Sequence, residues 1–427
     1  MRISRVLQSA FGLEHSVVEG FDFDEGAGAM VLSVRPVARA QGRCGRCGRR
    51  APRYDRGQGR RRWRALDLGT VQVFVEADAP RVACRSHGPT VAAVPWARHG
   101  AGHTRDFDDQ AAWLAVHVSK SAVVELLRVA WRTVGSIVAR VGADVDARVD
   151  RFEGLVRIGI DEVSYKRGHR YLTVVVDHDS GRLVWAAPGK EGTTLAAFFE
   201  ALGPQRTQRL THITCDMAPW FDWVLRHYAP QAVHCADPFH VVRWAIDALD
   251  VERRRAWRMA SGRGHVDERG RTHPAKGQAR SLRNARYALW KNPEHLSASQ
   301  HHQLEWIQKS DPRLYRAYLL KEGLRYCMSR HGDEARQALE RWLAWARRSR
   351  LPAFVAAADK IRAHRQEIEA AIDSRLTNAL VESTNTKIRL LTRIAYGFHG
   401  PEPLIALALL ALGGHCPALP GRDRPTY

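Results

Sequence analysis

Residues 154–165, GLVRIGIDEVSY, begin the stretch of the chain that decides its fold. Two more runs rich in β-branched residues follow, RYLTVVVDHDSG at 170–181 and RLVWAAPG at 182–189, and turn residues separate them. Such runs predict three consecutive β-strands. The spacing then becomes helical in TTLAAFFEALG, residues 193–203, where apolar side chains recur on one face.

The alternation of strands and helices continues downstream. LTHITCD at 210–216 and AVHCAD at 232–237 predict two more strands, and a helical pattern follows each of them. The resulting order, β-β-β-α-β-α-β-α, is typical of a ribonuclease H-like catalytic domain, a mixed five-stranded sheet with helices on both faces. We place its first part at 151–250. Residues 251–370 are strongly helical, so we expect an all-helical insertion before the last part of the catalytic domain at 371–427.

The first 150 residues predict three smaller regions. The alternating run AMVLSVRPV indicates a β-containing head at 1–40, and a cysteine- and arginine-rich region with further strands follows at 41–103. Three short amphipathic helical patterns at 104–150 fit a helix-turn-helix domain, although small helical bundles share that pattern. The predicted fold class is therefore a multidomain α/β protein.

Composition limits the partners of this chain. Lysine and arginine outnumber aspartate and glutamate by 66 to 45 among 427 residues, so the formal net charge is +21. Such an excess favours polyanionic partners. No apolar stretch reaches the roughly 18 residues that a membrane span needs, and the N-terminus lacks the apolar core of a signal peptide. We expect a cytoplasmic, nucleoid-associated protein without a membrane partner. Seven cysteines, an odd number, argue against a disulfide framework.

Two short motifs predict a structural zinc site. Cys44-x-x-Cys47 and Cys84-x-x-His87 each place two donors across a tight turn, and strands between the motifs can bring them together. Four thiolate or imidazole ligands make a closed tetrahedral Zn²⁺ site. The alternative is two unrelated pairs, and His99 or His103 could replace His87 as the fourth ligand.

Basic residues near these motifs suggest contacts with nucleic acid. Ten arginines and one aspartate lie between Gln41 and Arg64, a density that fits either a solvated face or a phosphate-contacting surface. Phosphate contacts carry no base information. The third helical pattern of the helix-turn-helix candidate would supply base contacts, although ordinary helix packing explains it nearly as well. The candidate DNA-binding residues in these two regions are Arg60, Arg61, Arg62, Arg132, Ser136 and Arg140.

Two aspartates at strand ends suggest a catalytic metal site. Asp161 follows a buried apolar strand, where an acid is costly unless it is paired or metal-bound. Asp216 ends the fourth strand, which neighbours the first in a ribonuclease H-like sheet, so the two carboxylates could share a cation. Asp237 competes for the second position, but Pro238 makes it a helix N-cap by default, with a supporting role open to it and to His240.

A third acid lies far downstream in LTNALVESTNTKI, residues 376–388. Glu382 and Asn385 are three residues apart, which puts them on one face of a helix, and Lys387 and Arg389 could reach a DNA backbone. A solvent-exposed acid on an amphipathic helix is the simpler reading of Glu382 alone. Two aspartates and a glutamate together suit a pair of hard divalent cations such as Mg²⁺ or Mn²⁺.

The chain resembles the ISL-three family of bacterial insertion-sequence transposases over nearly its whole length. The resemblance rests on the cysteine motifs and, in order, on IDEVSYKRGHRYLTVVVD, ITCDMAPW, CADPFHVV and LTNALVESTNTKIRLLTRIAYGF. It implies a DDE transposase with a zinc-binding region, a helix-turn-helix and a ribonuclease H-like domain, in which Asp161, Asp216 and Glu382 are the catalytic acids. Ser383 replaces a frequent glycine and His87 a frequent cysteine of that family.

The expected activity is metal-dependent DNA cleavage and strand transfer at terminal inverted repeats. Its partners would be double-stranded DNA, as transposon ends and target, and at least one further copy of the chain, because two ends must be brought together. The alternative is a transposase-derived DNA-binding regulator without catalytic activity. Both readings predict binding to terminal repeats, so only Mg²⁺-dependent nicking separates them.

Overall fold

A computed structural model describes residues 3–217, 219–262, 265–266, 272–273 and 276–422. The chain forms two compact units, one of Met1–Arg151 with Ile388–Tyr427 and one of Phe152–Lys387. Within the described ranges, no helix is both long enough and apolar enough to span a lipid bilayer.

Two small sheets form the N-terminal part of the first unit, after helix α1 (Ile3–Ala10). In strand order, the larger sheet consists of β1 (Ser16–Asp24), β2 (Ala29–Pro36), β5 (Gln72–Asp78) and β4 (Arg60–Arg64). The smaller sheet consists of β3 (Arg53–Asp55), β6 (Arg81–Cys84) and β7 (Gly88–Val91). The predicted regions 1–40 and 41–103 therefore share a sheet, since β5 pairs with β2 and both contribute apolar side chains to one core.

A three-helix group follows these sheets. It consists of α2 (Arg105–His117), α3 (Lys120–Leu127) and α4 (Trp131–Asp146). The hydroxyls of Thr104 and Ser119 cap the first two helices, as expected for residues at these positions. Helix α17 (Pro401–Leu412) packs against α4, where Gly142 leaves room for Ala406. Residues from Ile388 onward pack within the first unit, so the segment 371–427, predicted as the last part of the catalytic domain, is divided between the two units.

A mixed five-stranded sheet is the centre of the second unit. Its strands, in spatial order, are β10 (Leu183–Pro188), β9 (Arg170–Asp177), β8 (Arg157–Lys166), β11 (His212–Cys215) and β12 (Val233–Ala236). The first three are antiparallel neighbours, while β11 runs parallel to both β8 and β12. This arrangement agrees with the predicted number and order of strands.

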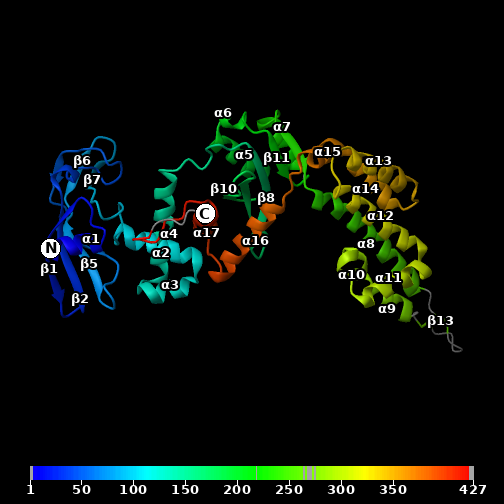
Figure 1. Ribbon diagram of the computed structural model, residues 1–427, viewed down its shortest axis with the longest axis horizontal. Helices are drawn as coiled ribbons and strands as arrows, with labels where there is room; N and C mark the ends of the chain where they lie inside the picture. Colours follow the sequence, from blue (N-terminus) through cyan, green and yellow to red (C-terminus); the bar gives the residue numbers. More distant parts are fainter. Residues whose placement is uncertain (1–2, 218, 263–264, 267–271, 274–275, 423–427) are drawn as a thin grey trace. The chain divides into compact units, whose positions relative to one another are not determined.

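Helices cover both faces of this sheet (Figure 1). On one face, α5 (Gly192–Leu202) and α7 (Pro219–Tyr228) bury Phe198 and Val224 against Ile158 and Ile160. The other face carries α16 (Ala379–Ile394). The side chain of Val381 in α16 comes so close that a Cβ atom on Gly159 would lie 2.4 Å from its Cγ2. The odd and even positions of β8 thus face different helices, as the pleat of a strand requires.

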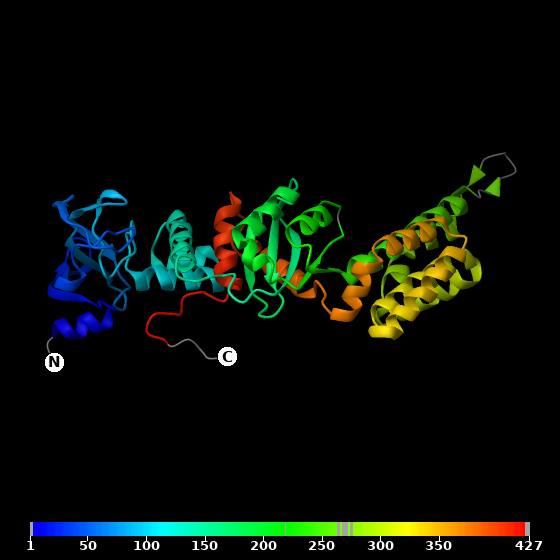
Figure 2. The same ribbon diagram turned by 90° about the horizontal axis from the view of Figure 1, so that it is seen from above.

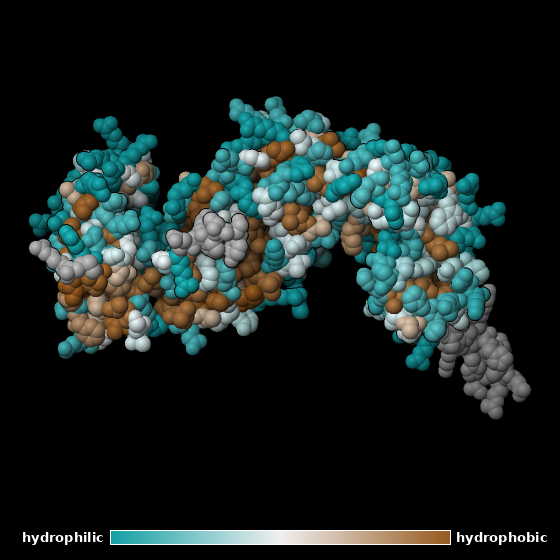
Figure 3. Space-filling model, viewed as in Figure 1, coloured by the Kyte–Doolittle hydropathy of each residue, from teal (hydrophilic) through white to brown (hydrophobic). Residues whose placement is uncertain are grey.

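A block of helices follows the last strand, and Figure 2 shows its helices packed side by side. Its helices are α8 (Pro238–Gly262), α9 (Lys276–Asn284), α10 (Arg286–Trp290), α11 (Ala298–Ser310), α12 (Pro312–Met328), α13 (Gly332–Arg348), α14 (Pro352–Ala363) and α15 (Arg365–Ser374). They enclose one apolar core, and the face in view in Figure 3 is largely hydrophilic. The block begins with α8 at Pro238 and not at 251, because α8 is one continuous helix whose buried face includes Val241 and Ala245.

Candidate zinc site and acidic centre

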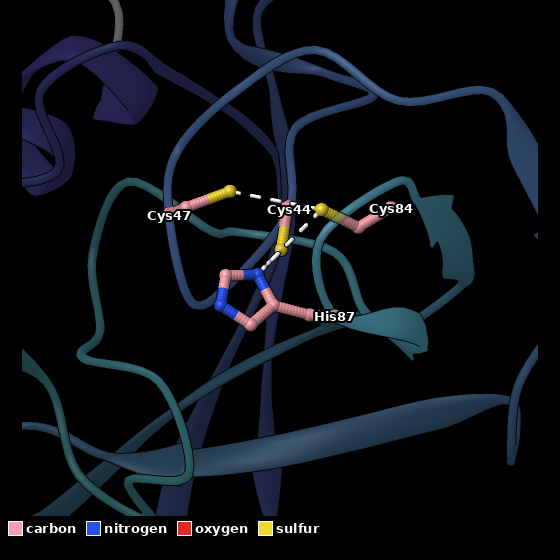
Figure 4. A group of neighbouring side chains, drawn as sticks. All are labelled: Cys44, Cys47, Cys84 and His87. Carbon is pink, nitrogen blue, oxygen red and sulfur yellow. Dashed lines mark hydrogen bonds between the residues drawn. The ribbon is translucent and has the colours of Figure 1, made fainter.

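Four side chains of the first unit converge beside the turn between β6 and β7 of the small sheet (Figure 4). Their ligand atoms, from Cys44, Cys47, Cys84 and His87, all lie within 4.8 Å of one another. The Sγ atoms of Cys47 and Cys84 are 3.7 Å apart, and Nδ1 of His87 lies 3.7 Å and 3.6 Å from the Sγ atoms of Cys44 and Cys84. A tetrahedral ion with Zn–S bonds of about 2.3 Å and Zn–N bonds of about 2.0 Å requires ligand separations of roughly 3.5–3.8 Å. The four donors fit zinc.

The local backbone prepares this cluster for a metal. Cys84 ends β6, and its sulfur accepts hydrogen bonds from the backbone N–H of Ser86 and from the His87 ring, which lower the pKa of the Cys84 thiol to about 6. A thiolate is the form that binds zinc. His99 and His103, the alternative ligands, are outside the group of possible metal ligands found among the described residues. His103 instead stacks on Phe107, with ring centroids 4.9 Å apart.

The arginines of β4 are ordered by acidic neighbours. Arg60 and Arg62 donate through Nε to the two carboxylate oxygens of Glu76, each at 2.7 Å, and both remain about half exposed. Arg61 lies on the opposite side of the strand, where it donates to the Ala101 carbonyl at 2.6 Å and lies over Trp63. A paired guanidinium with several free N–H groups can still contact a phosphate, so Arg60 and Arg62 retain that capacity.

Helix α4 presents only part of its predicted polar set to solvent. Arg132 and Ser136 are exposed. Arg140 is not free for base contacts, because Nη1 donates to both oxygens of the fully buried Asp108 at 3.1 Å and 2.9 Å. Asp108 is an α2 residue, so this ion pair holds α2 and α4 together. We therefore remove Arg140 from the candidate DNA-binding residues and assign it to helix packing.

The sheet register places three aspartates in one row. Thr214 pairs with Gly159, so Asp216, two residues further along, reaches the level of Asp161. Cys215 pairs with Ala236 in β12, which brings Asp237 to the same level on the far side of Asp216. Burial raises the pKa of Asp161 to about 6, and the charges of Asp216 and Asp237 add to that rise. Carboxylates crowded in this way are typical of cation sites.

Asp237 is the most deeply buried member of this row. It is 2% exposed, and its Oδ1 accepts from the Phe239 backbone N–H at 3.4 Å, the N-cap contact expected before Pro238. Its Oδ2 accepts from Nδ1 of His240 at 2.8 Å. The other ring nitrogen of His240 lies 3.8 Å from Oδ2 of Asp216. A hydrogen bond to Asp237 and the charges of the neighbouring carboxylates raise the pKa of His240. The His240 ring lies between Asp237 and Asp216, one nitrogen toward each.

Helix α16 brings Asn385 directly to Asp161. Nδ2 of Asn385 donates to Oδ2 of Asp161 at 2.8 Å, while the side-chain oxygen of Asn385 is buried without a hydrogen-bond partner among the described residues. Glu382, one turn earlier, is exposed in the first turn of α16. The carboxylates of Asp161, Asp216 and Glu382 do not form a group within 4.8 Å of one another in the described residues, as the zinc ligands do. Lys387 and Arg389 are exposed further along α16.

Sequence reasoning missed three polar residues of this centre. Glu162 is half-buried, and burial together with the charge of Asp161 raises its pKa to about 7. Asn378 and Thr214 are buried and contact one another across 164 residues of sequence. The only sequence signal for the last two is that polar residues occur inside apolar patterns, which does not indicate what they contact.

These features define a DNA-binding enzyme of the polynucleotidyl transferase class, with a zinc-binding region, a helix-turn-helix and an α/β catalytic part. Comparison with known proteins gives the family. Residues 158–408 match the ISL3 family of DDE transposases, described simply as transposase. Residues 92–142 match the helix-turn-helix domain of transposase family ISL3, and 40–87 match the zinc-finger of transposase IS204/IS1001/IS1096/IS1165. The chain belongs to the ISL3 transposase family, which confirms the predicted resemblance.

Curated relatives cover almost the whole chain. The transposases for insertion sequence element IS1557 from two strains of Mycobacterium tuberculosis are each 58% identical over 99% of this chain and 98% of their own length. The transposase for insertion sequence element IS1001 from Bordetella parapertussis is 26% identical over 93% of this chain and 95% of its own. The zinc-finger match and the Cys/His cluster together support a structural zinc ion, and the family implies a divalent metal for catalysis.

Proposed function

We propose that this transposase binds the terminal inverted repeats of its insertion sequence and cuts and joins DNA at a ribonuclease H-like centre. The observation that carries the proposal is the row of Asp161 and Asp216 on adjacent strands, contacted by the helix that bears Glu382. The strand order and the helices on both faces of the sheet are those expected for a ribonuclease H-like domain. Transposase relatives that cover the chain support the same activity.

The acidic centre suits divalent cations. The partnerless, buried oxygen of Asn385 and the mutually repelling carboxylates would both be stabilised by a nearby positive charge. Asp161, Asp216 and Glu382 would hold divalent cations such as Mg²⁺ or Mn²⁺. Bound ions of this kind activate a water or a 3′-hydroxyl as nucleophile and stabilise the leaving oxygen of the scissile phosphate.

The protein's own residues position these groups. Asn385 orients Asp161 by donating to Oδ2, and the backbone N–H of Glu162 donates to Oδ1 at 2.8 Å. The remaining lone pairs of the two oxygens would be available to a ligand. His240, held by the buried Asp237, restrains Asp216 from the other side. Outer-shell contacts of this type commonly change metal affinity or activity 10- to 100-fold when removed.

DNA would be bound by the first unit and by α16. We assign phosphate contacts to α16 and to the arginines of β4, of which Arg60 and Arg62 are exposed and Arg61 is half-buried, and base contacts to α4. The residues proposed for these contacts are Arg60, Arg61, Arg62, Arg132, Ser136, Lys387 and Arg389. Functional regions would then be the zinc-binding region at 41–103, the helix-turn-helix at 104–150 and the catalytic part with its helical insertion. Two copies of the chain, at least, would hold two transposon ends.

The test is cleavage of a labelled duplex that carries one terminal repeat and its flank, with and without Mg²⁺. Asp161→Asn, Asp216→Asn and Glu382→Gln should each abolish nicking. Repeat binding should stay within about twofold of wild type, because these three metal ligands are not among the residues that we propose to contact DNA. Asp222→Asn, an exposed acid of α7, is the matched control and should cleave normally.

Three results would contradict this proposal. Normal cleavage by Asp216→Asn together with loss in Asp237→Asn would move the second metal ligand to Asp237. Repeat binding by the wild-type protein without nicking in Mg²⁺ or Mn²⁺ would favour the catalytically inactive regulator. Nicking without products joined to target DNA would indicate a nuclease.

A further inference from the structure

We propose that Asn378 is a positioning residue that fixes Glu382 relative to Asp161 and Asp216. The inference rests on the proposed catalytic role of these three acids. Asn378 is a further residue, in addition to the three acids. Asn378 lies between α15 and α16, directly before the first residue of α16, and is 1% exposed.

Asn378 contacts the surroundings of all three acids. Its Nδ2 donates to the carbonyl of Ile160, the residue before Asp161, at 3.4 Å. Its Oδ1 accepts a short hydrogen bond from the hydroxyl of Thr214, two residues before Asp216. Its backbone carbonyl accepts from the N–H of Glu382 at 2.8 Å, which is the first helical hydrogen bond of α16. One buried side chain therefore ties the start of the glutamate helix to β8, which contains Asp161, and to β11, which Asp216 directly follows.

A further contact fixes the backbone of the same residue. The N–H of Asn378 donates to Oδ1 of Asp237 at 3.4 Å, so the buried acid that holds His240 also anchors the start of α16. The polar atoms of Asn378 are thus satisfied from β8, β11 and the end of β12. An asparagine is suited to this place because its amide offers a donor and an acceptor on one short stem.

The two hydrogen bonds of the Thr214 hydroxyl each have a defined donor and acceptor. Its single hydrogen is donated to Asn378, so Nε2 of His178, 2.8 Å away, must be the donor in the contact between His178 and Thr214. The chain His178–Thr214–Asn378 joins the residue after β9 to β11 and to the start of α16, beside Gly159. Thr214 and Asn378 are buried and His178 is half-buried, and a connected chain of this kind rigidifies the groups it joins.

Glu382 depends on this anchor because of its place in the helix. It lies in the first turn of α16, where helices fray most readily, and its side chain is exposed. The contact of Asn385 with Asp161 holds the helix one turn later. Asn378 and Asn385 therefore bracket Glu382, and loss of Asn378 would free the turn that carries the third carboxylate while Asn385 remains in place.

The experiment measures Mn²⁺ affinity by calorimetry on the full-length protein, beside repeat cleavage, repeat binding and thermal unfolding. Asn378→Ala and Asn378→Ser should each weaken Mn²⁺ binding and slow cleavage about 10- to 100-fold, with repeat binding unchanged. Serine retains the capacity to cap a helix but does not reach Thr214 and Ile160, so it separates anchoring from capping. Thr377→Ala is the matched control: it removes an exposed hydroxyl that accepts from the Ala379 N–H at 3.4 Å but leaves the contacts of Asn378 with β8 and β11, so its Mn²⁺ affinity and cleavage should be those of wild type.

A double-mutant cycle distinguishes positioning from a general loss of structure. If Asn378 acts through Glu382, adding Asn378→Ala to Glu382→Gln should lower Mn²⁺ affinity by less than about twofold, since coupled residues are non-additive. An equal loss in both backgrounds would overturn the proposal, as would an Asn378→Ala protein with the Mn²⁺ affinity and cleavage rate of Thr377→Ala. If Asn378→Ala does not fold, Thr214→Val provides the same comparison through removal of one hydroxyl.

Failure of this inference differs from failure of the catalytic assignment. Normal Mn²⁺ binding and cleavage by Glu382→Gln would refute the catalytic role of Glu382 itself. Loss of both in Glu382→Gln, with neither changed in Asn378→Ala or Thr214→Val, would refute Asn378 alone.

Discussion

Replacing Gly159 by alanine should disturb catalysis through the contact between the sheet and α16. Gly159 lies in β8, two residues before Asp161, and its backbone angles are ordinary for a strand. A Cβ atom there would lie 2.4 Å from Cγ2 of Val381, 2.9 Å from Nε2 of His178 and 3.1 Å from Oγ1 of Thr214. Since ordinary contacts begin near 3.4 Å, Val381 would have to retreat by about 1.0 Å.

The magnitude follows from that displacement. Overpacking of a closely packed core commonly costs about 1–3 kcal/mol in the free energy of unfolding. In a unit of this size that corresponds to a fall of roughly 2–12 °C in melting temperature. Val381 is adjacent to Glu382, so the same shift would misplace the carboxylate that we propose as the third metal ligand, and a 1 Å misplacement can reduce a rate about 100-fold. We expect cleavage to fall by about that factor.

Thermal unfolding and nicking of a labelled terminal repeat test this expectation together. Gly20→Ala is the matched control, because Gly20 is also a strand glycine and a Cβ atom there meets nothing within 4 Å. Gly159→Ala should bind the repeat normally while melting earlier and cleaving slowly. A Gly159→Ala protein with the melting temperature and cleavage rate of Gly20→Ala would refute the close packing of α16 on β8.

Further outcomes concern the metals and DNA. Because burial raises the pKa of Asp161 to about 6, Mg²⁺ binding to this carboxylate must displace a proton at acidic pH, so affinity should rise as pH increases through about 6. Calorimetry in buffers of different ionisation enthalpy would count the protons, and pH-independent affinity would contradict the assignment. Cys47→Ala should reduce bound zinc from about one ion per chain, measured by elemental analysis, and lower the melting temperature. Arg389→Ala should reduce the slope of log K against log salt by about one, whereas Arg140→Ala should chiefly destabilise the fold, because it leaves Asp108 without one of its buried partners.

Local sequence patterns were enough to predict most secondary structure. The five strands and their flanking helices in the second unit follow from runs such as 154–165 and 193–203, since alternation and helical spacing directly reflect which faces are buried. The zinc ligands were also accessible, because each half-motif places its two donors within one tight turn. Boundaries were less accurate where a region's core is completed by distant residues, as with β5 beside β2 and with α17 beside α4.

The candidate site, like the fold, was predictable from the sequence only in part. Composition and spacing by themselves determined that this chain is basic, carries a four-ligand zinc motif and places Asp161 and Asp216 after short apolar runs. The structure places Asp161 in the middle of β8 and Asp216 directly after β11, so Asp161 is not at a strand end as predicted. Only the tertiary structure decided that Arg140 is held by Asp108, that Asn385 reaches Asp161, and that Asn378 joins β8, β11 and α16. The physical reason is that these contacts connect residues 32 to 224 positions apart, and their free energy depends on partners that local pattern does not reveal.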